Sequence, residues 1–520
     1  MSHVSAVGGR HKAAHKLSWL DRALDALADP ARRERAVLAL LAGYAAIWSL
    51  YGAIAKGSQD LHFDMGEMIA WSREVALGTP KHPPLPAWVV WAWFEIFPLQ
   101  DWAYYLLAIV VATFALWVAW KACEPFLDGD KRLVGLALLT LVPFYNFHAL
   151  KFNANSAMTP VWALTTWWFL RSYRSLKPLD AAWAGLSAAA AMLSKYWSIV
   201  LLAGLGIAAL SDARRRAYFR SGAPWVTIAV GLAAMAPHLA WLYVEGFRPF
   251  RYAMESHPTG LWEAALSGLG YVAGALGYAA APALIALAAA RPSWAAIRDT
   301  AWPPAGDRRL ALIAFAAPLL LPVIAAIAAG AAIVSLWAIG SMTLLPVVLL
   351  SSPQVVVTRV MARRILALAI AVPLVALVLS PVIAVVIHRQ GVPNDATHYR
   401  LVAQAAEQAW RETTEEPLRL IGSYNNVLYG TVFYFSDHPS TLEITDPEVT
   451  PWTDAQRVAR EGIVLFCPVE QTRCVEAMDA LAARGPPGQR REVDVSRRFF
   501  GVADKPTRYV IVTIPPAAGG

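Results

Sequence analysis

Ionisable side chains gather between residues 57 and 84, just after the first apolar segment of the chain. They are Asp60, His62, Asp64, Glu67, Arg73, Glu74, Lys81 and His82. A carboxylate such as Asp64 can act as a general base, and a basic group such as Lys81 can hold a phosphate. Asp64 and Glu67 are three residues apart and would share one face of a helix. From the residue types alone, a solvated loop or a helix-capping acid is the alternative interpretation.

Three later segments contain further polar residues with similar chemistry. In chain order these residues are Lys151, Asn153, Asn155, Lys195, Arg251 and His257. Lysine, arginine and histidine gathered at one place would suit an anionic group such as a phosphate. Each of them alone could instead be an anchor at the membrane interface.

The composition indicates which elements must position these residues. Hydrophobic residues make up 57% of the 520 residues and charged residues 16%, whereas soluble globular proteins carry about 25% charged residues. The mean hydropathy is +0.43. These values exclude a disordered chain and an ordinary soluble enzyme, and they predict an α-helical membrane protein. The net charge of +8 is explained by basic cytoplasmic loops, so we expect no binding to nucleic acid.

Eleven segments are apolar enough to be candidate membrane spans. They are residues 36–56, 102–121, 132–150, 157–171, 181–194, 196–211, 223–243, 266–290, 310–329, 331–350 and 364–387. The basic segment 1–35 precedes the first span and predicts a cytoplasmic N-terminus. The lysine- and arginine-rich loops then fall on the inner side, and all the candidate site residues fall on the outer side. The odd number of spans predicts an outer C-terminus.

Two further regions complete the predicted membrane topology. Residues 84–98 contain Trp88, Trp91 and Trp93 and are too short to span, so we expect an amphipathic helix on the outer face. It belongs to a long first outer loop, residues 57–101. Residues 388–520 are more polar, and they predict a small periplasmic α/β domain.

Within this last domain we expect a helix over about 397–411, followed by several strands. The predicted strands are Leu418–Gly422, Thr431–Phe435, Gly462–Phe466 and Tyr509–Ile514. Cys467 and Cys474 could form a disulfide in an oxidising compartment, whereas Cys123 stands alone and is expected to be buried.

Common nucleotide-binding and zinc-binding motifs are missing from the sequence, so a nucleotide-driven pump is not supported. The sequence contains no Walker loop, no GxGxxG after a strand and no HExxH. The spans hold few charges and show no obvious inverted repeat, which does not favour an ion-driven transporter.

The first outer loop resembles a known family. Asp64 is followed by Ser72-Arg73-Glu74 and then by His82-Pro83-Pro84-Leu85. This order resembles the bacterial lipid-linked-sugar glycosyltransferases of GT-C fold, which are related to protein O-mannosyltransferases and to the lipid A aminoarabinose transferase. Leu193-Ser194-Lys195-Tyr196 and Phe250-Arg251-Tyr252 with Glu255-Ser256-His257 resemble later motifs of the family. The resemblance covers about residues 36–260, and it implies a GT-C module with about 11–13 transmembrane helices.

The resemblance implies an inner-membrane, inverting glycosyltransferase. Its donor would be a sugar on an undecaprenyl-type polyprenyl phosphate, and its acceptor lipid A, lipopolysaccharide or another glycolipid. Asp64 matches the catalytic acid of the family and would act as general base. Lys81, His82 and Lys195 would neutralise the departing phosphate, with Arg251 and His257 as further candidates. Glu67 would position Asp64 or a sugar hydroxyl.

Two departures from the family pattern bear on the site. Met65 follows Asp64 where a second acid is frequent, and Asn153-Ala154-Asn155 stands where the second outer loop often has a carboxylate. Asn155 can bind a sugar hydroxyl but cannot act as a base. We therefore expect no divalent metal and no cofactor. Three alternatives stay open: a non-catalytic protein that binds or moves a lipid-linked glycan, a transferase acting on protein or polysaccharide, and an unrelated transporter.

Overall fold

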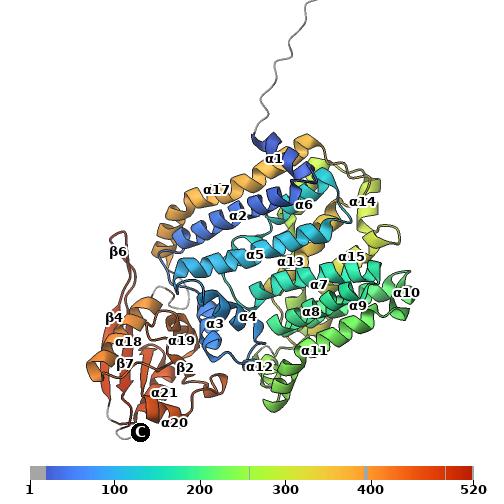
Figure 1. The fold of residues 1–520 in the computed structure, drawn as a ribbon. Helices are drawn as coiled ribbons and strands as arrows, with labels where there is room; N and C mark the ends of the chain where they lie inside the picture. Colours follow the sequence, from blue (N-terminus) through green and yellow to red (C-terminus); the bar gives the residue numbers. More distant parts are fainter. Residues whose placement is uncertain (1–18, 257, 392–395, 397, 487, 518–520) are drawn as a thin grey trace, which may run out of the picture.

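The structure is a computed structural model that describes residues 19–256, 258–391, 396, 398–486 and 488–517. Predictions for residues 1–18 and for His257 lie outside the described residues. The chain forms a large helical module followed by a smaller domain with a β-sheet (Figure 1).

Helices cover all the predicted spans. The long helices of the module are α2 (Arg33–Ala55), α5 (Asp101–Cys123), α7 (Ala154–Ser175), α8 (Pro178–Ser194), α9 (Ile199–Ser211), α11 (Ala223–Val244), α13 (Leu261–Ala290), α15 (Asp307–Ala329) and α17 (Arg359–Gln390). The span predicted at 132–150 bends by 78° between α6 (Gly129–Leu139) and the segment Pro143–Leu150. The span predicted at 331–350 is a 3-10 stretch, η4 (Ser335–Leu344), followed by α16 (Leu345–Leu350).

Among the described residues, six helices are long and apolar enough to cross a membrane by themselves, and the bent pair would make a seventh. The six are α2, α5, α11, α13, α15 and α17. Small residues allow close packing between several of the helices. Gly185 of α8, for example, faces the backbone of α11 at Thr227 and Gly231, where a Cβ atom would collide.

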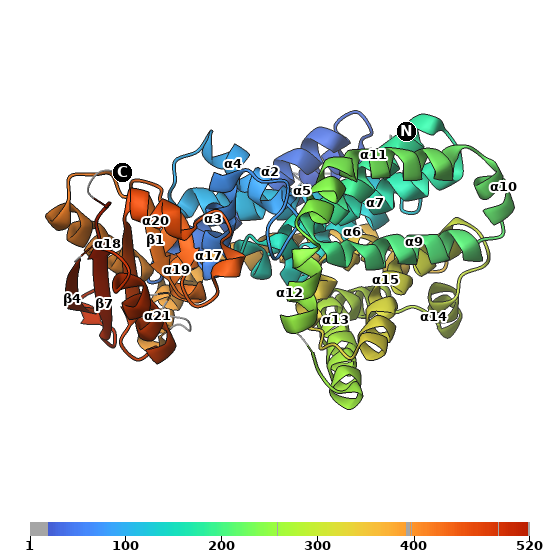
Figure 2. The same cartoon turned by 90° about the horizontal axis from the view of Figure 1, so that it is seen from below.

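Short helices lie between and beside the long ones. They are α1 (Trp19–Ala28), α3 (Phe63–Glu74), α4 (Leu85–Phe94), α10 (Arg215–Arg220), α12 (Arg248–Ser256) and α14 (Trp294–Ala301), with short 3-10 turns at Pro143–Tyr145, His148–Leu150 and Tyr196–Ser198. Both views show α3 and α4 beside the C-terminal domain, and α10 and α14 at the far end of the module (Figures 1 and 2). The helix predicted within 84–98 is therefore present as α4. Its sequence LPAWVVWAWF is apolar on all faces, so the expected amphipathic character is wrong.

The C-terminal domain has a five-stranded sheet with strand order β2-β1-β3-β7-β4. Its strands are β1 (Leu420–Ser423), β2 (Ser440–Glu443), β3 (Ile463–Pro468), β4 (Gln489–Val495) and β7 (Thr507–Ile514), and β5 (Arg498–Phe499) pairs with β6 (Val502–Ala503) separately. Strands β2, β1 and β3 are parallel, and β7 runs antiparallel to both β3 and β4. The helices of the domain are α18 (Tyr399–Thr413), α19 (Asn425–Val432), α20 (Ala455–Glu461) and α21 (Thr472–Ala482), with a 3-10 turn at Pro447–Val449.

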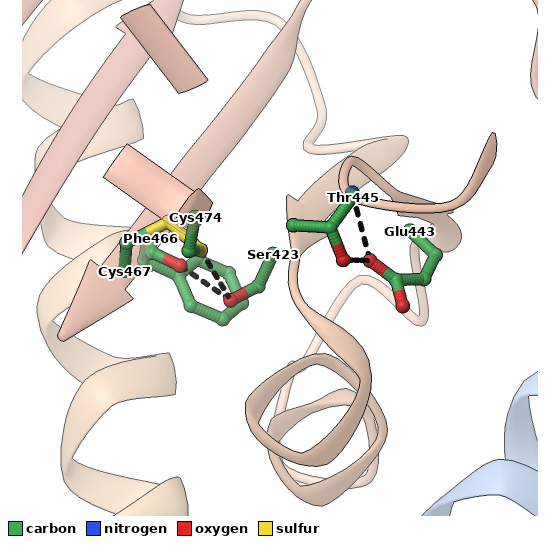
Figure 3. The surroundings of a disulfide bond; sticks show 6 residues. All are labelled: Ser423, Glu443, Thr445, Phe466, Cys467 and Cys474. Carbon is green, nitrogen blue, oxygen red and sulfur yellow. Dashed lines mark hydrogen bonds between the residues drawn. A yellow bond between two sulfur atoms is a disulfide. The ribbon is translucent and has the colours of Figure 1, made fainter. Parts of the chain in front are cut away.

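The domain agrees with most of the predicted strands. The strand predicted at Thr431–Phe435 is wrong, because these residues end helix α19 and the turn after it. Val432, Phe433 and Phe435 are buried there, so the apolar run reflects packing of a helix and turn. Cys467 and Cys474 form a disulfide between β3 and α21, and the hydroxyl of Ser423 donates to the Phe466 carbonyl beside it (Figure 3). Cys123 is buried and free, as expected.

The helical module and the C-terminal domain are joined by an extensive polar interface. Helix α19 packs on α3, where Gly66 lies against the backbone of Tyr429 so closely that no Cβ atom would fit. Asp60 is fully buried and pairs with Arg497, and it accepts a hydrogen bond from the backbone N–H of Arg400 at 3.0 Å. The first outer loop is therefore held against the C-terminal domain.

Candidate active site

Asp64 lies in the first turn of α3, directly after the long helix α2 and a short loop. His62 caps this helix, since its Nδ1 accepts the backbone N–H of Asp64 at 3.1 Å. A carboxylate in the first turn is favoured by the helix dipole. Burial lowers the pKa of His62 to about 4, and Lys151 and Lys56 act in the same direction against the opposing effect of Asp64. The ring is therefore neutral at pH 7 and free to accept this bond.

Two side chains from the segment just before α7 contact the carboxylate of Asp64. Nδ2 of Asn153 donates to Oδ2 at 2.9 Å, and Nζ of Lys151 lies 3.0 Å from the same oxygen. Burial alone would raise the pKa of Asp64, but Lys151, His62 and the Asn153 amide together hold it below its ordinary value. Asp64 is therefore ionised at neutral pH, which is the state a general base requires.

Asn153 is held in place by the start of α7. Its Oδ1 accepts the backbone N–H groups of Asn155 and Ser156, and the Ser156 hydroxyl accepts the backbone N–H of Asn153 at 2.7 Å. This reciprocal capping box fixes the side chain. The amide that reaches Asp64 is therefore oriented before any substrate arrives.

Glu67 and Lys81 bind each other. Nζ of Lys81 lies 2.7 Å from Oε1 of Glu67, and both side chains are buried. The rings of Tyr252 and Tyr429 lie 5.5 and 5.2 Å from the ammonium, within the range of a cation–π contact. Burial opposes the charge, but Glu67 and the tyrosines raise the pKa of Lys81 above its ordinary value. The charge of Lys81 is thus compensated within the protein.

Lys195 occupies the break between α8 and the 3-10 turn before α9. Its Nζ donates to Oδ1 of Asn155 at 2.6 Å and lies 4.8 Å from the ring of Trp337. Burial lowers the pKa of Lys195 to about 7, against a smaller opposing effect of Asp64. An anion placed beside Lys195 would restore its charge.

His82 is half-buried and lies edge-on to the ring of Trp71 at 5.7 Å. Its backbone carbonyl accepts both the N–H and the hydroxyl of Thr79, each at 3.0 Å. Burial lowers the pKa of His82 to about 3, with Lys195 and Lys81 acting in the same direction. A neutral His82 offers an N–H group to a ligand and no positive charge, which differs from the role expected from the sequence.

Arg251 lies exposed on α12. This helix reaches the site instead through Tyr252, which faces Lys81, and through Phe250, whose ring lies 4.7 Å from that of Tyr196. Sequence reasoning assigned no role to either aromatic residue, because an isolated tyrosine or phenylalanine gives no chemical signal.

The Ser72-Arg73-Glu74 motif has a structural role. Arg73 donates to the carbonyl of Pro439 at 2.7 Å and to that of Val432 at 3.2 Å. Glu74 accepts a hydrogen bond of 3.0 Å from the hydroxyl of Ser440. The motif therefore fastens α3 to the C-terminal domain.

A cavity of about 430 Å³ opens beside Asp64. All three side chains that contact the carboxylate, those of His62, Lys151 and Asn153, line it together with Asn155. Its other polar lining residues include Lys56, Gln59, Asp60, His148 and Gln390, and its apolar walls include Phe63, Phe147, Leu336, Ile339 and Ile387. The described part of the chain contains no cluster of three or more His, Cys, Asp or Glu residues suited to a metal ion.

Known proteins are similar to this chain in sequence over part of its length and in fold over most of it. Residues 81–241 match the family described as dolichyl-phosphate-mannose-protein mannosyltransferase. A lipopolysaccharide core galacturonosyltransferase, RgtB, of Rhizobium johnstonii is 30% identical over 214 residues, which are 40% of this chain and 42% of that protein. The chain thus matches less than half of the length of this relative.

Two solved structures share the fold of nearly the whole chain. They are those of ArnT from Cupriavidus metallidurans, bound to undecaprenyl phosphate and in the apo state. Each has a TM-score of 0.59 and covers 92% of this chain and 97% of the ArnT chain, at 14% and 13% identity respectively. The chain therefore has an ArnT-like GT-C fold with a C-terminal sheet domain and is a multi-pass membrane protein. The family resemblance predicted from the sequence is confirmed.

Proposed function

We propose that the chain is an inverting glycosyltransferase of the bacterial inner membrane, using a sugar carried on a polyprenyl phosphate. The acceptor we favour is lipid A, lipopolysaccharide or another glycolipid on the periplasmic face. The observation that carries the proposal is the carboxylate of Asp64, with the Asn153 amide at 2.9 Å and the Lys151 ammonium at 3.0 Å. The sugar transferase named among the relatives and the matched family support the reaction type.

We assign the two substrates to different places around Asp64. An inverting transfer needs the acceptor oxygen and the leaving phosphate on opposite faces of the anomeric carbon. The cavity is lined by His62, Lys151 and Asn153, whose side chains make polar contacts with the Asp64 carboxylate, so we assign it to the acceptor. We assign the phosphate to Lys195, which has an amide and an aromatic ring beside it and, among the residues that the structure describes, no carboxylate within ion-pair distance.

The reaction then follows with balanced atoms and charges. Asp64 removes the proton of the acceptor hydroxyl as its oxygen bonds to the anomeric carbon. The bond between that carbon and the phosphate oxygen breaks, and the polyprenyl phosphate leaves with the electron pair. Lys195 stabilises the developing negative charge, and His82 offers its N–H. No step requires a metal or a cofactor.

A periplasmic position of the active site is part of the proposal. The disulfide between Cys467 and Cys474 supports it, because such bonds persist in oxidising compartments. The C-terminal domain packs directly on α3, so the domain and Asp64 would lie on the same side of the membrane.

The test is lipid mass spectrometry on host cells with the gene, without it, and with an Asp64→Asn variant. We expect one glycosyl mass to disappear from one lipid without the gene and to stay absent with Asp64→Asn. Asp128→Asn, an exposed carboxylate before α6, is the matched control and should restore the product. Product formation by Asp64→Asn at the wild-type level would contradict the proposal.

A further inference from the structure

His238 lies in α11 and is almost fully buried, with 2% of its surface exposed. Both of its ring nitrogens have a polar partner. Nδ1 lies 2.6 Å from the backbone carbonyl oxygen of Leu77, and Nε2 lies 3.0 Å from the hydroxyl of Tyr196. Nothing local in the sequence singles out this histidine, because its partners are 161 and 42 residues away.

The two partners belong to the two segments that carry Lys81, His82 and Lys195. Leu77 begins the short loop that leads to Lys81 and His82, and Tyr196 directly follows Lys195. His238 is thus a single side chain that connects both segments to a membrane-spanning helix.

The contacts around His238 restrict its movement. Its ring stacks on Trp241 with a centroid distance of 5.6 Å and an angle of 15°. The Trp241 ring lies against Gly78, at a point where a Cβ atom would collide with it. Tyr196 in turn packs on Phe250 of α12. The loop, the turn and two helices therefore meet at this histidine.

The chemistry of the partners fixes the tautomer of the ring. A carbonyl oxygen only accepts hydrogen bonds, so Nδ1 must carry the proton that binds Leu77. Nε2 of the neutral ring then accepts a hydrogen bond from the hydroxyl of Tyr196. Both bonds are satisfied in one protonation state, without a neighbouring charge.

We propose that His238 is a positioning residue that sets the distance between the Lys81–His82 loop and the Lys195–Tyr196 turn. A polyprenyl phosphate bound between them would then meet Lys195 and the His82 N–H in a fixed arrangement. This inference rests on the proposed function, since it concerns how the same phosphate is held. It assigns no part in bond making to His238.

The experiment measures binding of undecaprenyl phosphate to the full-length chain in detergent, together with the melting temperature of each variant. His238→Asn keeps a donor near the position of Nδ1 and removes Nε2, and Tyr196→Phe removes the same bond from the other side. Loss of one neutral hydrogen bond changes an equilibrium by about three- to tenfold. We expect each variant to weaken binding by about that factor. The double variant should lose no more than either one, because both remove the same contact.

A matched control separates positioning from general stability. Tyr173→Phe removes a buried hydroxyl that binds the carbonyl of Ala209 at 3.3 Å, next to the cytoplasm-facing α10 of the predicted topology. It should lower the melting temperature but leave binding unchanged. If Tyr196→Phe and His238→Asn behaved like this control, His238 would be a structural residue only and the inference would be wrong.

Failure of the proposed function would give a different result. Lys195→Gln should abolish most of the binding of undecaprenyl phosphate. If the wild-type chain did not bind this lipid, or if Lys195→Gln bound it as tightly as the wild type, the assignment of the phosphate site itself would be overturned. The inference about His238 would then fall as well, because these segments would have no phosphate to hold.

Discussion

Asn153 donates a hydrogen bond of 2.9 Å to Oδ2 of Asp64, across 89 residues of sequence. An amide thus occupies the place beside the carboxylate where the family resemblance suggests that a second acid is frequent. An amide N–H stabilises the ionised form of Asp64, whereas a neighbouring carboxylate would oppose it. In the proposed reaction Asp64 is the single base, and Lys151 contacts the same oxygen.

Asn153→Asp should convert the site to a two-carboxylate arrangement. Aspartate is as good a helix cap as asparagine, so α7 should start unchanged. Repulsion between the two carboxylates should raise the pKa of Asp64 and move the acid limb of the pH–rate profile upward by about one pH unit. The measurement is the transfer rate between about pH 3 and 6, because the pKa of Asp64 lies below its ordinary value. An unchanged acid limb would show that Asp64 is not the titrating base.

The affinity for polyprenyl phosphate should depend on the charge of Lys195. Burial lowers its pKa to about 7, so the ammonium form is present below pH 7 and is lost as the pH rises through that value. Only the charged form attracts the phosphate, so affinity for undecaprenyl phosphate should fall between pH 7 and 9. Lys195→Arg should flatten this dependence, because arginine stays protonated. Equal slopes in both proteins would contradict the assignment.

Lys56 should contribute to acceptor binding. It lines the cavity beside Asp64, so an anionic group bound there would have an ammonium as its partner. Lys56→Met should raise the KM for a phosphorylated glycolipid acceptor by about tenfold. It should leave binding of undecaprenyl phosphate unchanged. A loss of donor binding instead would place the donor in the cavity.

The pair formed by Glu67 and Lys81 should matter for stability. Glu67→Gln leaves a buried ammonium without its carboxylate, which costs about 3–5 kcal/mol of unfolding free energy. The double variant Glu67→Gln/Lys81→Met removes both charges and should be more stable than Glu67→Gln. Thermal unfolding of the three proteins checks this order. If the double variant were the least stable, the pair would act through another contact.

The sequence predicted the helices well because apolar length alone determines where a chain can span a membrane. It singled out Asp64 and Lys195 as candidates because ionisable residues are rare near apolar segments and because both lie in motifs that resemble the family. It could not show that Glu67 and Lys81 neutralise each other, since nothing local specifies that contact. The Ser72-Arg73-Glu74 motif was recognised, but its partners lie 366 residues further along the chain. The same long-range packing turned the predicted strand at Thr431–Phe435 into the end of a helix.

The contacts between α3 and the C-terminal domain have a consequence for biogenesis. Residues 57–101 leave the ribosome early, but the carbonyls that bind Arg73 and the Tyr429 ring beside Lys81 belong to residues 429–439. The surroundings of Lys81 are therefore completed only after most of the chain has been synthesised. A nascent chain that has already inserted its helices would still lack one wall of its site, and it would gain activity only when the last domain has folded.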